Sequence, residues 1–178
     1  TKGGPKERRI FFDRLFSIVD SDYLNTLQKF NRALKQRNAL ILNKNQTNEE
    51  NFLPWEEKLS ISAIKLWETR SKCFSDYLKS LNSVVSEYQR GLVLNVHYIE
   101  KTSTKEEFQK KLKQTRERDS LLGTTSYGPH RDNIKILWSG KDIREYGSQG
   151  EHKISLILLK LAEINLIKQK TGKHPTIL

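Results

Sequence analysis

A single apolar seam over residues 54–90 limits the fold more than any other feature of the sequence. Its members recur with a mean step close to 3.6 residues, which is the period of one face of an α-helix. Pro54 suits the first position of such a helix and Gly91 suits its C-terminal stop. At ~1.5 Å per residue the helix is about 50 Å long, too long for an ordinary compact domain. The seam consists of Trp55, Leu59, Leu66, Cys73, Tyr77, Val84 and Tyr88.

A second helix is expected before this one, starting near Tyr23 with an N-cap from the polar residues 20–22. Because a polar loop, residues 43–51, separates the two helices, they predict an antiparallel helical pair, or arm. Thr104 and Glu107 have the spacing of a capping box and open a third helix expected to end near residue 119. The apolar face of the helix near Tyr23 consists of Leu24, Leu27, Phe30, Leu34 and Ile41.

The pattern changes after residue 120, where strands and turns replace long helices. Residues 133–138 and 141–146 predict two strands joined by a Ser139-Gly140 hairpin turn. An amphipathic helix is expected over residues 151–169, and the apolar run 175–178 starts a further strand. With a short strand over residues 92–98, the expected fold class is mixed α+β.

The charge of the chain indicates a polyanionic partner, with nucleic acid as the first candidate. Lys and Arg number 32 and Asp and Glu number 21, which gives a net charge of +11. The positive excess lies toward the two ends of the chain. Contacts to DNA are then expected mostly at phosphates, although each cation can instead be solvated or ion-paired. The candidates are Arg8, Arg9, Arg14, Lys29, Arg32, Lys35 and Arg37.

Other compositional features narrow the class of protein. The longest apolar stretch is far shorter than the ~20 residues that a membrane span needs, so no membrane association is expected. The single Cys73 excludes an internal disulfide framework, and we expect it to be a small core residue. The four histidines have no metal-ligand spacing, so no metal site is expected. Because the sequence contains no Met, we expect an internal fragment of a longer protein.

The residues Ser148-Gln149-Gly150, just before the last expected helix, are the strongest candidate binding motif. A hydroxyl beside free amides at a helix N-terminus can bind an anion, because the helix dipole and the unpaired N–H groups both face it. Gly150 lets a phosphate approach the backbone closely. Ser-x-x-Glu is also the pattern of a capping box, which needs no ligand.

Four blocks of sequence, in order along nearly the whole chain, resemble the RecF family of bacterial recombination mediators. The first is Gly4-Pro5-Lys6-Glu7-Arg8-Arg9 with Phe12-Asp13, and the second is residues 33–40 (ALKQRNAL). The third is Gly128-Pro129-His130-Arg131-Asp132. The fourth is residues 147–153 (GSQGEHK), followed by residues 159–163 (LKLAE) and 171–175 (TGKHP). The fourth block is similar to the signature-helix region of the family.

The resemblance implies an ABC-type ATPase head formed by residues 1–21 and 121–178, with a helical arm over residues 22–120. It implies a cytoplasmic, nucleoid-associated bacterial protein of DNA repair, recombination, replication and the SOS response. Such a protein binds ATP with Mg²⁺, forms an ATP-dependent homodimer and binds DNA. It also acts with RecO and RecR to load recombinase at single-strand gaps. By the same resemblance, Ser148, Gln149 and Gly150 contact the γ-phosphate of a nucleotide held by the opposite subunit, and residues 128–132 form a head motif.

The sequence departs from a complete ATPase in two ways. It contains no G-x-x-x-x-G-K-[ST] phosphate loop, and Gly172-Lys173-His174 does not supply one. The apolar run ends at Leu178, before any paired acidic residues. We therefore expect no catalytic residue in this chain and no stable nucleotide binding or ATP hydrolysis by it alone. Two alternatives are a basic helical nucleic-acid-binding module without nucleotide chemistry, and a head-and-arm fragment of another SMC-like protein.

Overall fold

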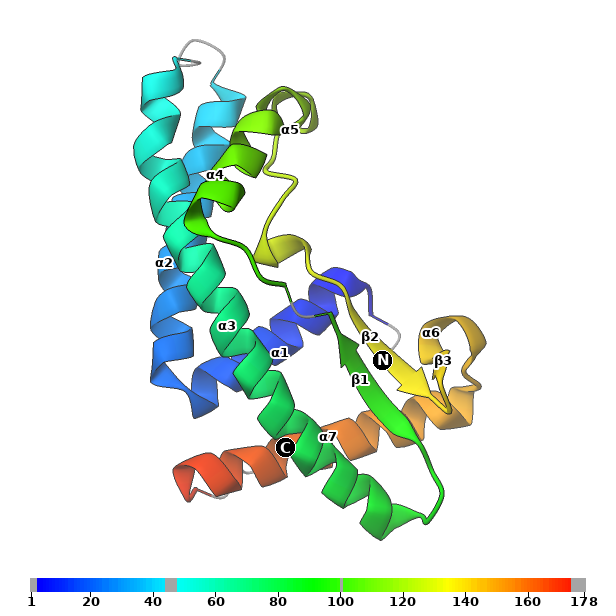
Figure 1. Ribbon diagram of the computed structural model, residues 1–178. Coiled ribbons are helices and arrows are strands. Elements are labelled where there is room, and N and C mark those ends of the chain that lie inside the picture. Colours follow the sequence, from blue (N-terminus) through cyan, green and yellow to red (C-terminus); the bar gives the residue numbers. More distant parts are fainter. Residues whose placement is uncertain (1–2, 44–47, 100, 174–178) are drawn as a thin grey trace. The chain divides into compact units, whose positions relative to one another are not determined.

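The computed structural model describes residues 3–43, 48–99 and 101–173, and its ribbon is shown in Figure 1. The chain divides into two compact units. Unit 1 contains residues 1–21, 71–99 and 133–178, and unit 2 contains residues 22–70 and 100–132. The elements, in chain order, are α1 (Pro5–Val19), α2 (Ser21–Leu42), α3 (Glu49–Tyr88), β1 (Leu94–Tyr98), α4 (Lys105–Gln114), α5 (Arg116–Leu122), η2 (Pro129–Arg131), β2 (Ile134–Trp138), β3 (Lys141–Asp142), α6 (Ile143–Tyr146) and α7 (Gln149–Thr171).

The long expected helix is present as α3, which contains 40 residues. It begins at Glu49, five residues before the expected start, so Pro54 lies inside the helix and not at its first position. The middle of the seam is buried, from Leu59 through Tyr77, which is 0% exposed. Its C-terminal end turns outward, because Val84 is half-buried and Tyr88 is 53% exposed, while the neighbouring Val85 is buried instead.

Unit 1 is built on a three-stranded antiparallel sheet in the order β1-β2-β3. Val96 pairs with Ile136 at the centre of the β1–β2 ladder, and both side chains are buried. An aromatic cluster joins α1 to the C-terminal half of α3, because the rings of Phe12 and Phe74 lie 4.8 Å apart. On the same half of α3, the Tyr77 hydroxyl donates a 3.1 Å hydrogen bond to the Leu159 carbonyl of α7.

The second strand of the expected hairpin is much shorter than the sequence indicated. Only Lys141–Asp142 pairs with β2, and the next four residues form the helical turn α6. The Asp142 side chain causes the change, because it accepts a 3.0 Å hydrogen bond from the Arg144 amide and so caps α6. The strand expected over residues 175–178 lies outside the described residues.

Unit 2 contains α2, the N-terminal half of α3, the helices α4 and α5, and η2. The expected capping box at Thr104 is present: its hydroxyl accepts from the Glu107 amide at 3.2 Å, and the Glu107 carboxylate accepts from the Thr104 amide at 2.9 Å. The third helix is interrupted at Thr115 and continues as α5. Gly123 ends α5 in the left-handed conformation, with φ of 65°.

The two units divide the chain differently from the expected head and arm. The first boundary falls after Ser21, where the arm was expected to begin, but residues 71–99 belong to unit 1 and residues 121–132 to unit 2. Residues 71–99 belong to unit 1 because Phe74 packs against the aromatic rings of α1. Residues 121–132 belong to unit 2 because Asp132 accepts hydrogen bonds from Trp67 and Arg70 of α3.

Candidate functional site

The N-terminus of α7 is the first candidate site, and it lies in unit 1. Ser148 is the N-cap: its Oγ accepts from the Glu151 amide at 3.3 Å, and the Glu151 carboxylate accepts from the Ser148 amide at 2.7 Å. Ser148, Gln149 and Gly150 are all exposed. The capping box is therefore real, and it leaves the Ser148 O–H with the capacity to donate to a ligand, since a hydroxyl both donates and accepts.

The two glycines that flank this site have different structural roles. At Gly147, an added Cβ would lie 2.4 Å from the Ile143 carbonyl oxygen, so the fold itself requires glycine there. At Gly150, the same added atom would meet only the Ser148 Oγ, at 4.0 Å, and the φ of Gly150 is not positive. Neither crowding nor backbone conformation within the described structure accounts for glycine at position 150.

The motif Gly128-Pro129-His130-Arg131-Asp132 lies in unit 2. Asp132 is 1% exposed and receives three side-chain donors. They are Trp67 Nε1 at 3.0 Å, Arg70 Nη1 at 2.8 Å and Lys101 Nζ at 2.7 Å. A buried carboxylate with three donors is fully compensated, so Asp132 holds η2 against α3. Gly128 has φ of 134°, a conformation that residues with a side chain rarely adopt.

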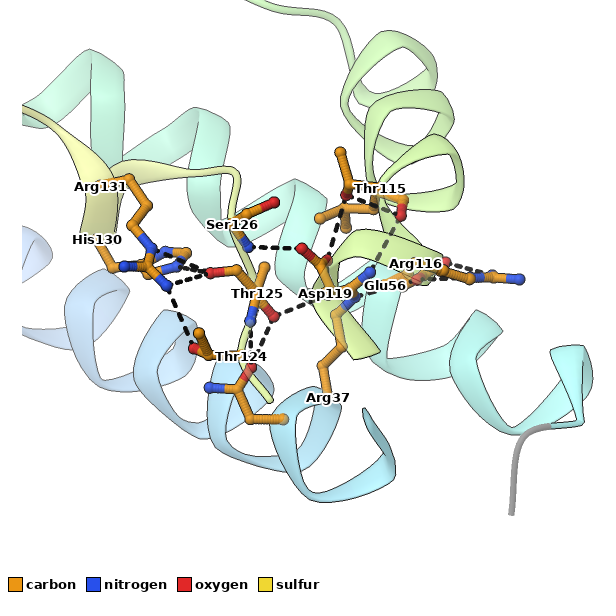
Figure 2. A network of polar contacts seen from close by, with 12 residues as sticks. Arg37, Glu56, Thr115, Arg116, Asp119, Thr124, Thr125, Ser126, His130 and Arg131 are labelled. Atoms are coloured by element: carbon orange, nitrogen blue, oxygen red, sulfur yellow. Dashed lines mark hydrogen bonds and ion pairs between the residues drawn. The ribbon is translucent and has the colours of Figure 1, made fainter. Parts of the chain in front are cut away.

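The remaining polar residues of this motif converge on one backbone oxygen (Figure 2). His130 Nε2 lies 2.8 Å from the Thr125 carbonyl oxygen, and Arg131 donates to the same oxygen at 3.0 Å and 3.1 Å. These contacts order the loop between α5 and β2. In the described structure, the motif thus has a structural role in unit 2.

A buried ion network around Arg37 was missed by the sequence analysis (Figure 2). Arg37 is 0% exposed, and its guanidinium contacts Glu56 at 3.1 Å and Asp119 at 2.7 Å. It also donates to the Thr125 hydroxyl at 2.8 Å and to the Leu112 carbonyl at 3.0 Å. The expectation that Arg37 contacts DNA is therefore wrong, because all three of its nitrogens are engaged inside unit 2.

Arg116 extends this network to the edge of unit 2. It forms a two-point contact with Glu56, at 3.0 Å and 2.6 Å. These hydrogen bonds raise the pKa of Arg116 above its usual value. Glu56 therefore connects a buried and a partly exposed arginine. The signal in the sequence that could have revealed this network is the apolar setting of Arg37, between Ala33 and Ile41 on one helix face.

The other DNA-contact candidates divide into buried and accessible groups. Arg8 is 6% exposed, and desolvation by burial lowers its pKa, so it is also corrected from a phosphate contact to a core residue. Arg9 is half-buried and Arg14 is exposed, both on α1. Lys29, Arg32 and Lys35 are exposed on α2. Of these accessible candidates, Arg9 and Arg14 thus lie in unit 1, whereas Lys29, Arg32 and Lys35 lie in unit 2.

Cys73 is a buried, protonated thiol. It is 6% exposed, and burial raises its pKa to about 12. A thiolate is the reactive form of cysteine, so Cys73 has no nucleophilic role at neutral pH. No helix in the described parts of the chain is both long and apolar enough to cross a membrane.

Two solved structures match this fold along almost the entire chain. One, of the recombination mediator protein RecF-ATP in the RecFOR pathway, has a TM-score of 0.87 and 26% identity. The other, RecF-ATPrS in the same pathway, has a TM-score of 0.85 and 27% identity. The matches cover 98% and 97% of this chain and 49% of each solved chain. The fold thus defines the class: part of an ABC-type ATPase.

Curated relatives identify the family within that class. The DNA replication and repair protein RecF of Lachnoclostridium phytofermentans is 35% identical over 99% of this chain and 50% of its own length. That of Bacteroides fragilis is 33% identical over 99% of this chain and 48% of its own length. The chain belongs to the RecF family. It spans about half the length of the curated relatives it matches, and no protein-family model matches the sequence.

Proposed function

We propose that this chain is part of an ATP-dependent DNA-binding protein of recombinational repair, in which Ser148, Gln149 and Gly150 contact nucleotide held by a second subunit. The observation that carries the proposal is the exposed N-terminus of α7, with a glycine at position 150 that the fold does not require. The likeness to RecF-ATP supports the choice of ligand.

The chemistry of the site suits a phosphate. The first amides of α7 have no partner within the helix, and the positive end of the helix dipole lies there. The Ser148 hydroxyl adds one O–H donor. Gly150 allows the backbone amides to approach an oxyanion without hindrance from a side chain. Since helix amides alone bind phosphate weakly, the rest of the nucleotide and its Mg²⁺ would be held by the opposite subunit.

The proposal is tested by Ser148→Arg in the full-length parent protein. A long cation at this position blocks the approach of a second subunit that carries nucleotide, so ATP-dependent dimerisation measured by analytical ultracentrifugation should be lost. Binding of fluorescent ATP to the monomer should change less than about twofold, because the residues that grip the phosphates lie elsewhere.

Thr104→Arg is the matched control, because it removes an equivalent capping box from α4. Loss of either cap costs about 1 kcal/mol of stability. If both variants dimerise on ATP as the wild type does, Ser148 is only a helix cap and the proposal fails.

We propose that DNA phosphates contact the accessible cations Arg9, Arg14 and Lys35. Replacing one phosphate-binding cation should reduce the slope of log K against log salt by about 0.7–0.9 for each contact removed. Lys35→Gln, measured by fluorescence anisotropy with duplex DNA from low to moderate salt, checks this. An unchanged slope for Lys35→Gln and for the corresponding Arg9→Gln and Arg14→Gln variants would show that DNA binds elsewhere.

The partners named for the RecF family extend the same proposal. The solved relatives belong to the RecFOR pathway, and we propose that the parent protein acts with RecR-type and RecO-type mediators to load recombinase at gaps.

A further inference from the structure

A groove between α2 and α3, inside unit 2, has no role in the proposed function. It is a cavity of about 460 Å³. Figure 1 shows the two helices side by side, in blue and cyan. Four cations surround the groove and an apolar surface forms part of its lining. The residues that matter here are Lys29 and Arg32 from α2, and Trp55, Lys58, Ile61 and Lys65 from α3.

The lining of the groove is apolar between these cations. Ile61 is 53% exposed and Trp55 is half-buried. The buried Ser62 hydroxyl donates to the Lys58 carbonyl at 2.7 Å, so its O–H donor is already used within α3. An exposed isoleucine beside an indole ring favours contact with an apolar side chain, since removing that surface from water is favourable.

None of the four cations forms an ion pair in the described parts of the chain. No carboxylate there lies within ion-pair distance of Lys29, Arg32, Lys58 or Lys65. Six other cations of unit 2 do form ion pairs. Four like charges around one groove repel one another, and an anionic occupant would relieve that repulsion. The paired cations are Arg37, Arg70, Lys101, Lys105, Lys113 and Arg116.

The position of Lys58 argues against a nucleic acid as occupant. Its Nζ lies 4.9 Å from the centre of the Trp55 ring, so the ammonium group covers one face of the indole. A base that stacked on that face would have to displace a favourable cation–π contact. A phosphate backbone by itself offers no apolar group to cover Ile61.

We propose that this groove binds an acidic segment of a partner protein, one that places an apolar side chain on Ile61, beside Trp55, and carboxylates beside the four cations. A peptide with this pattern satisfies both properties of the groove at once, as amphipathic segments do in apolar grooves. The inference goes beyond the proposed function, because it depends on neither nucleotide nor DNA binding.

The test uses the full-length parent protein and a fluorescent 12-residue peptide that alternates Glu with Leu. Its comparison probes are the same peptide with Ser in place of Leu, and a single-stranded oligonucleotide of equal charge. Ile61→Ser and Lys65→Glu should each weaken binding of the Glu-Leu peptide by about tenfold, which corresponds to 1.4 kcal/mol. Ile61 is exposed, so its replacement should leave the fold intact, which circular dichroism checks.

Lys35→Glu is the matched control, one helical turn after Arg32 but outside the groove. It should lower affinity for DNA and leave affinity for the Glu-Leu peptide unchanged, so the DNA proposal and the groove proposal can fail separately. If the Ser-containing peptide binds as tightly as the Glu-Leu peptide, the groove is a general polyanion site. The same conclusion follows if Lys65→Glu weakens binding of the oligonucleotide more than binding of the Glu-Leu peptide. Either result, or no peptide binding at physiological salt, would overturn the inference.

Discussion

At the scale of single residues, burial decides what an arginine does in this chain. Arg37 and Lys35 lie two positions apart on α2, yet one is 0% exposed and the other faces solvent. The sequence could show that both were basic. It could not show that Asp119, which is 82 positions from Arg37, lies 2.7 Å from its guanidinium. Long-range partners of this kind separate a core arginine from a phosphate-binding one.

Arg37→Met should be strongly destabilising. The substitution leaves the buried carboxylate of Asp119 without its main counter-charge, and breaking a buried ion pair in this way costs about 3–5 kcal/mol. Urea unfolding of the full-length parent protein, followed by circular dichroism, measures the effect. Lys35→Met serves as the control and should stay within about 0.5 kcal/mol of the wild type. A loss below about 1 kcal/mol for Arg37→Met would contradict the buried network.

At the scale of elements, capping boxes located two helix starts, while the start of α3 and the length of the second hairpin strand were predicted wrongly. The capping boxes at Thr104 and Ser148 were readable, because both partners lie within four residues of each other. The second hairpin strand was overestimated. The Ser139-Gly140 turn favoured a second strand over residues 141–146, but the Asp142 cap turns the residues after it into α6. Pro54 was misplaced because it is the sixth residue of α3, where proline lacks the N–H that would bond to the Glu50 carbonyl, and not the first residue, where proline is usually favoured.

The glycines before α7 give a prediction at this scale. Gly147→Ala should disrupt the end of α6, because the added methyl group would collide with the Ile143 carbonyl. Gly150→Ala should preserve or raise stability by up to about 1 kcal/mol, since alanine is the better helix former. Thermal unfolding of both variants compares the two directly. If Gly147→Ala unfolds at the wild-type temperature, the collision is relieved by a local shift.

At the scale of the whole molecule, the fold class and the family could be inferred from sequence, while the division into units could not. Mixed α+β structure followed from the change of pattern after residue 120. The RecF resemblance depended on blocks spread along the chain, and the curated relatives confirm it. The two observed units differ from the expected head and arm because residues 49–70 of α3 belong to unit 2 and residues 71–88 belong to unit 1. Both parts carry apolar seam residues, so the sequence alone does not distinguish them.

Separate cores predict separate responses to local damage. In native-state hydrogen exchange of the full-length parent protein, Arg37→Met should increase amide exchange in α4 and α5 by more than about tenfold. Amides of α7 and of the β1–β2 ladder should change by less than about twofold, because their core contains Phe74 and Tyr77 and not Arg37. Equal acceleration in both sets would show that the two units unfold as one.

The capping box at Ser148 also bears on the entropy of ligand capture. Its hydroxyl oxygen already accepts a hydrogen bond from α7, so the side chain holds one rotamer before any phosphate arrives. Immobilising a free side chain on binding costs about 0.5–1.5 kcal/mol of conformational entropy. Because the capping box already restricts the Ser148 side chain in the folded protein, less of this entropy remains to be lost on binding. In the proposed nucleotide contact, Glu151, whose carboxylate completes the box, would therefore help to preorganise a hydrogen bond from Ser148.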